Sequence, residues 1–257
     1  MSFNTTSVLL LIGVFAGMLL SLIIGQRLGR REKDVGADSG RIQLTAVEAA
    51  IFGLMGLMIA FTFSGAAQRY ELRRQLVVDE ANAIGTSYLR IDLLPAVRQA
   101  ALRDKYRQYL EARLAVYRPG LDPSHESREA ITTKLQREIW TATVAALSEA
   151  PPQAAIIVVP ALNEMIDITT RRSIAALTHT PKLIMAMLLT LGLVCSLLAG
   201  YVIGSTHIRH ARFHWLAFAF MMTITIYVIF DLDYPRQGLI QIEFADQALT
   251  DLLADMN

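Results

Sequence analysis

Four long apolar stretches dominate the pattern of hydrophobic and polar positions along this chain of 257 residues. They are residues 7–26, 44–66, 183–204 and 213–230, and nearly all charged residues lie outside them. Each stretch is long enough to cross, as a helix, a bilayer core roughly 30 Å thick. The pattern predicts an all-α membrane protein with four transmembrane helices in two pairs. A helical extramembrane domain is expected between the second and third spans.

The same pattern divides the chain into four parts. Residues 1–66 hold the first two spans and a short basic loop, and residues 67–182 form the extramembrane helical domain. Residues 183–231 hold the last two spans, and residues 232–257 form an extramembrane tail.

Helix-breaking residues subdivide the two extramembrane parts. Proline and glycine are scarce in residues 67–182 and cluster at a few places, which predicts about four helices there. The first of these helices continues from span two with no breaker beyond Gly85, so span two is expected to extend as one long rod. In the tail, apolar residues alternate at Ile240, Ile242 and Phe244, which predicts a short extended piece.

Composition supports a membrane protein and excludes several other classes. The chain is 53% hydrophobic and has a mean hydropathy of +0.39, which is unusually apolar for a soluble domain. A net charge of +1 gives no bulk attraction for nucleic acid, so no nucleic-acid partner is expected. Cys195 is the sole cysteine, which rules out an intrachain disulfide or a cysteine-based zinc site. The chain contains no recognisable reaction motif, so neither an enzymatic activity nor a cofactor is expected.

The basic residues of the short loops predict the orientation. Residues 27–43 carry five Lys or Arg residues, and the hairpin after span three carries Arg209 and Arg212. Because short loops rich in Lys and Arg stay in the cytoplasm, residues 67–182 and both termini are expected on the opposite, outer side of the cell membrane. Arginines also flank the long insert, but long domains translocate largely regardless of charge.

Small residues recur every four positions in three of the spans and are expected to mark faces where helices pack closely. They are Gly13, Gly17, Ser21 and Gly25 in span one, Gly56, Ala60 and Ser64 in span two, and Gly192, Ser196, Gly200 and Gly204 in span three. Contact within one subunit is the simpler interpretation, and contact between subunits or around a pore is the alternative.

Three polar groupings are candidates for chemistry. His207, His210 and His214 would share a helix face, but the neighbouring arginines disfavour a metal site. Arg73, Arg74, Arg171 and Arg172 lie near the membrane, where they would attract inorganic anions or contact lipid phosphates. A structural polar network is expected from Glu80, Asn82, Asn163, Asp167, Asp231 and Asp233, with Asp167 and Arg171 spaced as an ion pair.

Several segments together resemble the bestrophin-like domain family, a set of bacterial membrane proteins. They are Phe61-Thr-Phe-Ser64, Arg69-Tyr-Glu-Leu-Arg-Arg74, Glu80-Ala-Asn-Ala-Ile84, Leu162-Asn-Glu-Met-Ile-Asp167 and the Asp231-x-Asp233-x-Pro235-x-x-Gly238 pattern. The resemblance covers roughly residues 40–255 and implies a multi-pass protein of the bacterial inner membrane. It also implies kinship with bestrophins, which are pentameric anion channels with a pore lined by the second span.

Two functions follow from the resemblance and the residues. The first is a homo-oligomeric ion channel, with an anion as the expected ion, in which Phe52, Ile59 and Phe63 of span two line the path. The bestrophin calcium clasp is not expected, because no dense acidic cluster follows span four. The alternative is a non-conducting membrane scaffold or sensor whose helical domain binds a partner.

Overall fold

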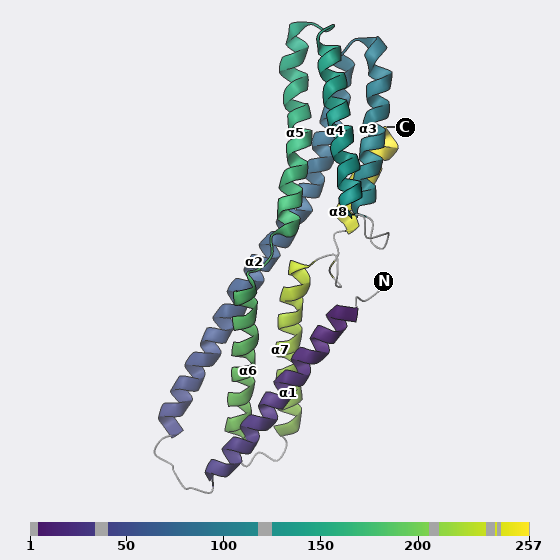
Figure 1. Ribbon diagram of the computed structural model, residues 1–257. Coiled ribbons are helices and arrows are strands. Elements are labelled where there is room, and N and C mark those ends of the chain that lie inside the picture. Colours follow the sequence, from purple (N-terminus) through teal and green to yellow (C-terminus); the bar gives the residue numbers. More distant parts are fainter. Residues whose placement is uncertain are drawn as a thin grey trace. The chain divides into compact units, whose positions relative to one another are not determined.

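The computed structural model describes residues 5–33, 41–117, 125–205, 211–234, 240 and 243–256. Secondary structure within these residues is helical (Figure 1). The helices are α1 (Thr5–Lys33), α2 (Arg41–Leu89), the 3₁₀ helix η1 (Arg90–Leu93), α3 (Ala96–Tyr117), α4 (His125–Leu147), α5 (Pro152–Leu177), α6 (Lys182–Ser205), α7 (Ala211–Asp233) and α8 (Glu243–Asp255).

Among the residues that the structure describes, four helical stretches are long and apolar enough to cross a membrane. They lie within Val8–Arg31, Ala46–Leu93, Pro152–Ser205 and Trp215–Asp233. The predicted all-helical class with four apolar spans is therefore confirmed. The helix α2 is 49 residues long and continues well beyond the apolar stretch at residues 44–66.

The chain forms two compact units. The first comprises Met1–Tyr70 with His179–Gln241, and the second comprises Glu71–Thr178 with Ile242–Asn257. The long helix α2 contributes residues to both units.

The first unit packs α1, the first part of α2, α6 and α7. Its buried core includes Met18 and Leu22 of α1, Met55 of α2, Leu188 of α6 and Ile226 of α7. Many other apolar side chains on these helices are exposed, as expected for spans that face hydrocarbon.

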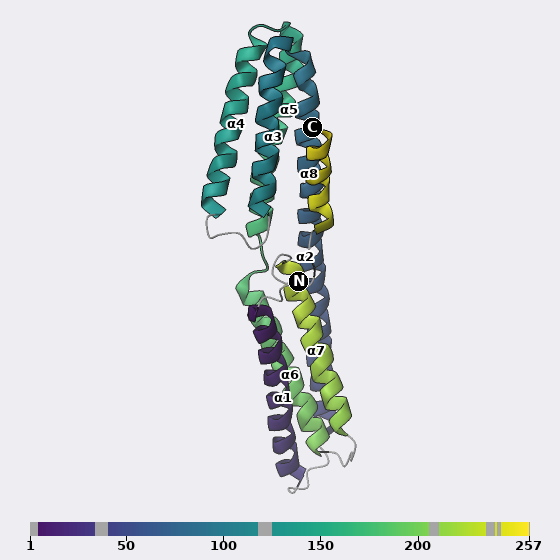
Figure 2. The ribbon, with the colours of Figure 1, turned by 90° about the vertical axis from the view of Figure 1, so that its right-hand side faces the viewer.

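The second unit is a bundle made from the remainder of α2 with α3, α4 and α5 (Figure 2). Its core includes Ile84, Leu102, Tyr109, Ile139 and Met165, all fully buried. Each lies on an apolar stripe with the three- and four-residue spacing of an amphipathic helix, which explains why these segments pack as a bundle.

The helix α8 belongs to the second unit. Its residue Leu252 approaches Gly85 of α2 so closely that a Cβ added there would lie 3.2 Å from the Leu252 side chain. Phe244 lies within α8, so the extended piece predicted from alternating residues is wrong at that position. The amphipathic pairing of Leu249 and Leu253 against the bundle favours a helix there.

A buried hydroxyl pair lies inside this bundle. The side-chain oxygens of Ser87 and Tyr106 are 2.6 Å apart and buried. Burial raises the pKa of Tyr106 to about 12, although the hydrogen bond with Ser87 partly offsets the rise. The tyrosine is therefore neutral at physiological pH and acts as a structural residue.

Candidate functional site

The candidate pore-lining residues share one face of α2, because they are separated by seven and four positions. The Phe52 ring lies edge-on to Phe218 of α7, with the ring centroids 6.2 Å apart. Ile59 is partly buried against the core of the first unit, whereas the side chain of Phe63 is 44% exposed. This row therefore lies at the border between the packed and the open sides of α2.

The open side of α2 is lined by small residues. Gly53, Gly56, Ala60 and Ser64 are all exposed. A Cβ added at Gly53 or Gly56 would meet no atom within 4 Å. We call these four residues the small-residue face of α2. Gly53 was absent from the sequence prediction because it breaks the strict four-residue spacing.

The small residues of α1 and α6 are instead in close contact with each other's helix. A Cβ added at Gly25 would lie 1.9 Å from the Leu197 carbonyl oxygen, and one at Gly200 would lie 2.1 Å from that of Leu22. A Cβ added at Gly204 would likewise lie 2.3 Å from the Gln26 carbonyl oxygen. The helices α1 and α6 thus pack backbone to backbone within one subunit.

The remaining small residues of these two helices lie towards the other end of the contact. A Cβ at Gly17 would be 3.4 Å from Leu193, and one at Gly192 would be 2.7 Å from the Met18 side chain. Ser196 is buried, Ser21 is half-buried, and Gly13 faces open space.

Gly29 extends the close contact beyond Gly25, although the sequence pattern did not predict it. A Cβ added at Gly29 would lie 2.2 Å from the Tyr201 carbonyl oxygen.

A polar node joins three segments at one end of the first unit. Arg69 Nε donates to the buried Asp233 carboxylate over 2.7 Å, and another nitrogen of this guanidinium donates to the Thr180 hydroxyl. The Thr180 backbone N–H donates to the second Asp233 oxygen over 2.7 Å. One carboxylate therefore fixes the end of α7, the segment before α6 and a turn of α2.

Asp231, two residues earlier in α7, also holds a backbone group through its carboxylate. Its carboxylate accepts a hydrogen bond from the Ile240 backbone N–H over 2.9 Å. Both aspartates of the Asp231-x-Asp233 pattern thus orient the chain around the end of α7.

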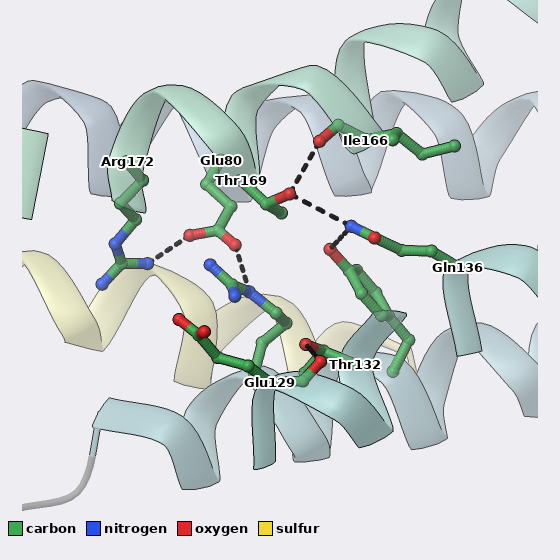
Figure 3. Close-up of polar contacts among 9 residues, drawn as sticks. Glu80, Glu129, Thr132, Gln136, Ile166, Thr169 and Arg172 are labelled. Carbon is green, nitrogen blue, oxygen red and sulfur yellow. Dashed lines mark hydrogen bonds and ion pairs between the residues drawn. The ribbon is translucent and has the colours of Figure 1, made fainter. Parts of the chain in front are cut away.

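Glu80 is the centre of a buried ionic cluster in the second unit (Figure 3). Its carboxylate is fully buried, with Arg113 Nε of α3 donating to one oxygen over 2.5 Å and Arg172 of α5 donating to the other. Three helices are joined by this one side chain. A second group of hydrogen bonds lies beside this cluster. In it, the Gln136 side chain of α4 donates to the hydroxyl groups of Tyr109 and Thr169, each over 3.2 Å.

The other residues predicted for the polar network are not gathered with Glu80. Asn82, Asn163 and Asp167 are exposed. Asn82 lines a shallow surface hollow together with Asp79, Arg90 and Glu164. Arg171 forms its ion pair with Glu164, which lies about one turn before Asp167 in α5, and not with Asp167 as predicted.

The four candidate anion-attracting arginines are all engaged by neighbouring groups. Arg73 is buried and donates to the carbonyl oxygens of Ala175 and Thr178 over 2.9 and 2.6 Å. Arg74 holds both carboxylate oxygens of Glu71, and this pairing lowers the pKa of Glu71. Arg172 and Arg171 contact glutamates, as described above.

Metal ligation has no support in the part of the chain that the structure describes. Within it, no group of three or more His, Cys, Asp and Glu side chains is placed to hold an ion. His207 and His210 lie outside the described residues, and the side chain of His214 is likewise not described.

Comparison with known proteins identifies the family. The family model of the Bestrophin-like domain matches residues 12–246. No curated protein matches the chain.

Solved structures share the fold. A bacterial bestrophin homolog from Klebsiella pneumoniae, solved by zinc phasing, is 15% identical, with a TM-score of 0.70 over 93% of this chain and 97% of that one. A point mutant of a bestrophin homolog from the same organism is 17% identical, with a TM-score of 0.71 over 95% and 98% of the two chains. Since the matched family region covers most of the sequence, the chain belongs to the bestrophin-like domain family.

Proposed function

We propose that this protein is a homo-oligomeric ion channel of the membrane, with α2 of each copy lining the conduction path. Membership of the bestrophin-like family and the four apolar helices support this proposal. The observation that carries it is the arrangement of residues around α2.

The small-residue face of α2 is suited to contact with a second copy. In lipid, helices associate mainly through close packing, and glycine, alanine and serine allow backbones to approach. The glycines between α1 and α6 already have such a partner, whereas Gly53 and Gly56 face open space within the subunit. A neighbouring copy would fill that space.

The row of Phe52, Ile59 and Phe63 then falls beside that contact. At 100° per residue, the row lies roughly 80° around α2 from the middle of the small-residue face. In a ring of copies joined through the small-residue faces, this flank of α2 turns towards the central axis. A row of large apolar side chains at that position forms a hydrophobic constriction, which controls conduction by excluding water.

The charge of the conducted ion is not encoded in this part of α2. Residues 49–67 contain no charged side chain. Arg74, Arg171 and Arg172 contact glutamates, and Arg73 donates to carbonyl oxygens, so these arginines give no support for anion selection. The anion preference expected from the family resemblance stays a prediction.

Flux measurements on two phenylalanine variants test the proposal. Phe63 and Phe61 are both exposed, but Phe61 lies on roughly the opposite side of α2 from the row. We expect Phe63→Ala to raise ion flux into proteoliposomes by roughly tenfold, as for removal of a barrier of about 1.4 kcal/mol. The matched variant Phe61→Ala should leave the flux near that of the native protein.

Separate chloride and potassium gradients in the same liposomes determine the ion. A reversal potential near that of chloride supports the anion expectation, and one near that of potassium contradicts it. Absence of flux of either ion from folded protein would refute the channel and favour the scaffold or sensor.

A further inference from the structure

Three arginines form an exposed cluster in the last turns of α1. Arg27, Arg30 and Arg31 are all exposed to solvent in the isolated chain. Within the part of the chain that the structure describes, none of the three makes an ion pair or a hydrogen bond. A cluster of three like charges near the end of an apolar helix attracts anionic groups at the membrane surface.

The cluster lies on the side of α1 that points away from α6. Gly25 and Gly29 mark the side that contacts α6, because a Cβ at either would overlap the backbone of that helix. At 100° per residue, the mean direction of the three arginines is roughly 170° from that of the two glycines. The packing of α1 on α6 therefore leaves the guanidinium groups free to face the surrounding membrane.

An apolar stripe continues from the arginines along the same side of α1. Ile23, Leu20 and Ala16 are exposed, and their directions fall within the sector covered by the arginines. They extend over roughly 15 Å of helix from Arg27, which is the depth of one leaflet of the hydrocarbon core.

We propose that this side of α1 binds an anionic phospholipid, with its headgroup phosphate on Arg27, Arg30 and Arg31 and an acyl chain along Leu20 and Ile23. The fork of N–H groups in arginine matches the oxygen spacing of a phosphate, and arginine is less strongly hydrated than lysine. A headgroup supplies negative charge to the arginines, and the acyl chain covers the exposed apolar stripe. A free anion would satisfy the arginines only. This site is independent of whether the protein conducts ions.

Native mass spectrometry of the detergent-purified full chain tests the site. Phosphatidylglycerol and phosphatidylcholine with identical acyl chains are added in equal amounts, and the ratio of the two retained lipids is measured. We expect the native protein to retain phosphatidylglycerol preferentially. The triple variant Arg27→Gln, Arg30→Gln, Arg31→Gln should lower this ratio by roughly tenfold or more, given about 1 kcal/mol per basic residue near an anionic surface.

A second triple variant controls for the loss of net charge. Arg107→Gln, Lys134→Gln and Arg137→Gln remove three positive charges from α3 and α4 and should leave the lipid ratio unchanged. If the first triple variant does not fold, the single variant Arg30→Gln carries the test, with an expected decrease of about fivefold.

Three results from the comparison of the native and variant proteins would overturn the proposal. They are a native protein without headgroup preference, an α1 variant that keeps the preference, and an equal loss in the control variant. Displacement of the lipid by soluble glycerol phosphate at equal concentration would also overturn it, because the apolar stripe would then contribute nothing.

Discussion

Glu80 shows at the scale of one residue what spacing predicts and what it leaves open. It lies four residues from Leu76 and from Ile84, so the sequence predicts that it points towards other helices, and it is fully buried. Its partners Arg113 and Arg172 lie 33 and 92 residues further along the chain. Helical periodicity carries no information about contacts at such separations, so the two partners of Glu80 can be identified only from the structure.

Removing the charge of Glu80 should strongly destabilise the second unit. Glu80→Gln keeps the shape of the side chain but leaves two buried guanidinium groups without their shared carboxylate. We expect a loss of about 3–5 kcal/mol in the free energy of unfolding, the range found when one partner of a buried ion pair is removed. Chemical unfolding of the purified protein, followed by helical circular dichroism, measures it.

Glu164→Gln provides the matched control on α5. Its pair with Arg171 is about half exposed on both sides, so the expected loss is below about 1 kcal/mol. Equal stability of the two variants would show that the Glu80 cluster contributes no more than a surface ion pair.

At the scale of helices, four-residue spacing predicted which small residues share one side of a helix, but not which of them contact another helix. Gly25, Gly200 and Gly204 contact the opposite helix, while Gly13 and Gly56, chosen by the same spacing, face open space. Spacing fixes the side of the helix on which a residue lies, whereas the crossing point of two helices decides which residues touch. Gly29 was missed because the apolar stretch ends at residue 26, although α1 continues to Lys33.

A methyl group at Gly200 should disrupt the contact between α1 and α6. Gly200→Ala places a Cβ 2.1 Å from the Leu22 carbonyl oxygen, so the two backbones must move apart. Overpacking typically costs about 1–3 kcal/mol and outweighs the roughly 1 kcal/mol gain in helix propensity. We therefore expect a lower thermal unfolding temperature in detergent.

Gly13→Ala is the control for this substitution. It makes the same chemical change in a helix of the same contact but meets no atom within 4 Å, so it should be neutral or slightly stabilising. A Gly200→Ala protein as stable as Gly13→Ala would mean that α1 and α6 do not pack through these backbones.

The arginines near the ends of the insert illustrate a limit at the same scale. The sequence places Arg73, Arg74, Arg171 and Arg172 as two adjacent pairs, which suggests an exposed charge ring. Adjacent residues on a helix point about 100° apart, so the members of each pair face different surroundings. Arg73 and Arg172 are buried, and Arg74 and Arg171 form surface ion pairs.

For the whole molecule, the sequence predicted the helical class and the four apolar spans, because these depend on long runs of residue type. The proposed assembly of copies would depend on surfaces that have no partner within the described part of one chain. On α2, an exposed row of small residues lies beside a row of large apolar ones, an arrangement that favours contact between copies. The oligomeric state is therefore the property that a single substitution on α2 tests best.

Gly56→Leu should prevent assembly while leaving each subunit folded. A leucine at this position fits the open space within one chain, since no atom lies within 4 Å of the added Cβ, but it keeps the small-residue faces of two copies apart. We expect the native protein in detergent to have the mass of an oligomer by light scattering and the variant to shift to the monomer, with unchanged helical content and no ion flux. Gly13→Leu makes the same change in an equally open position on α1 and should keep both the oligomer and the flux. If the Gly56→Leu protein keeps the mass of the native oligomer, copies do not meet through this face of α2. The proposal that Phe52, Ile59 and Phe63 face a common axis would then have no support.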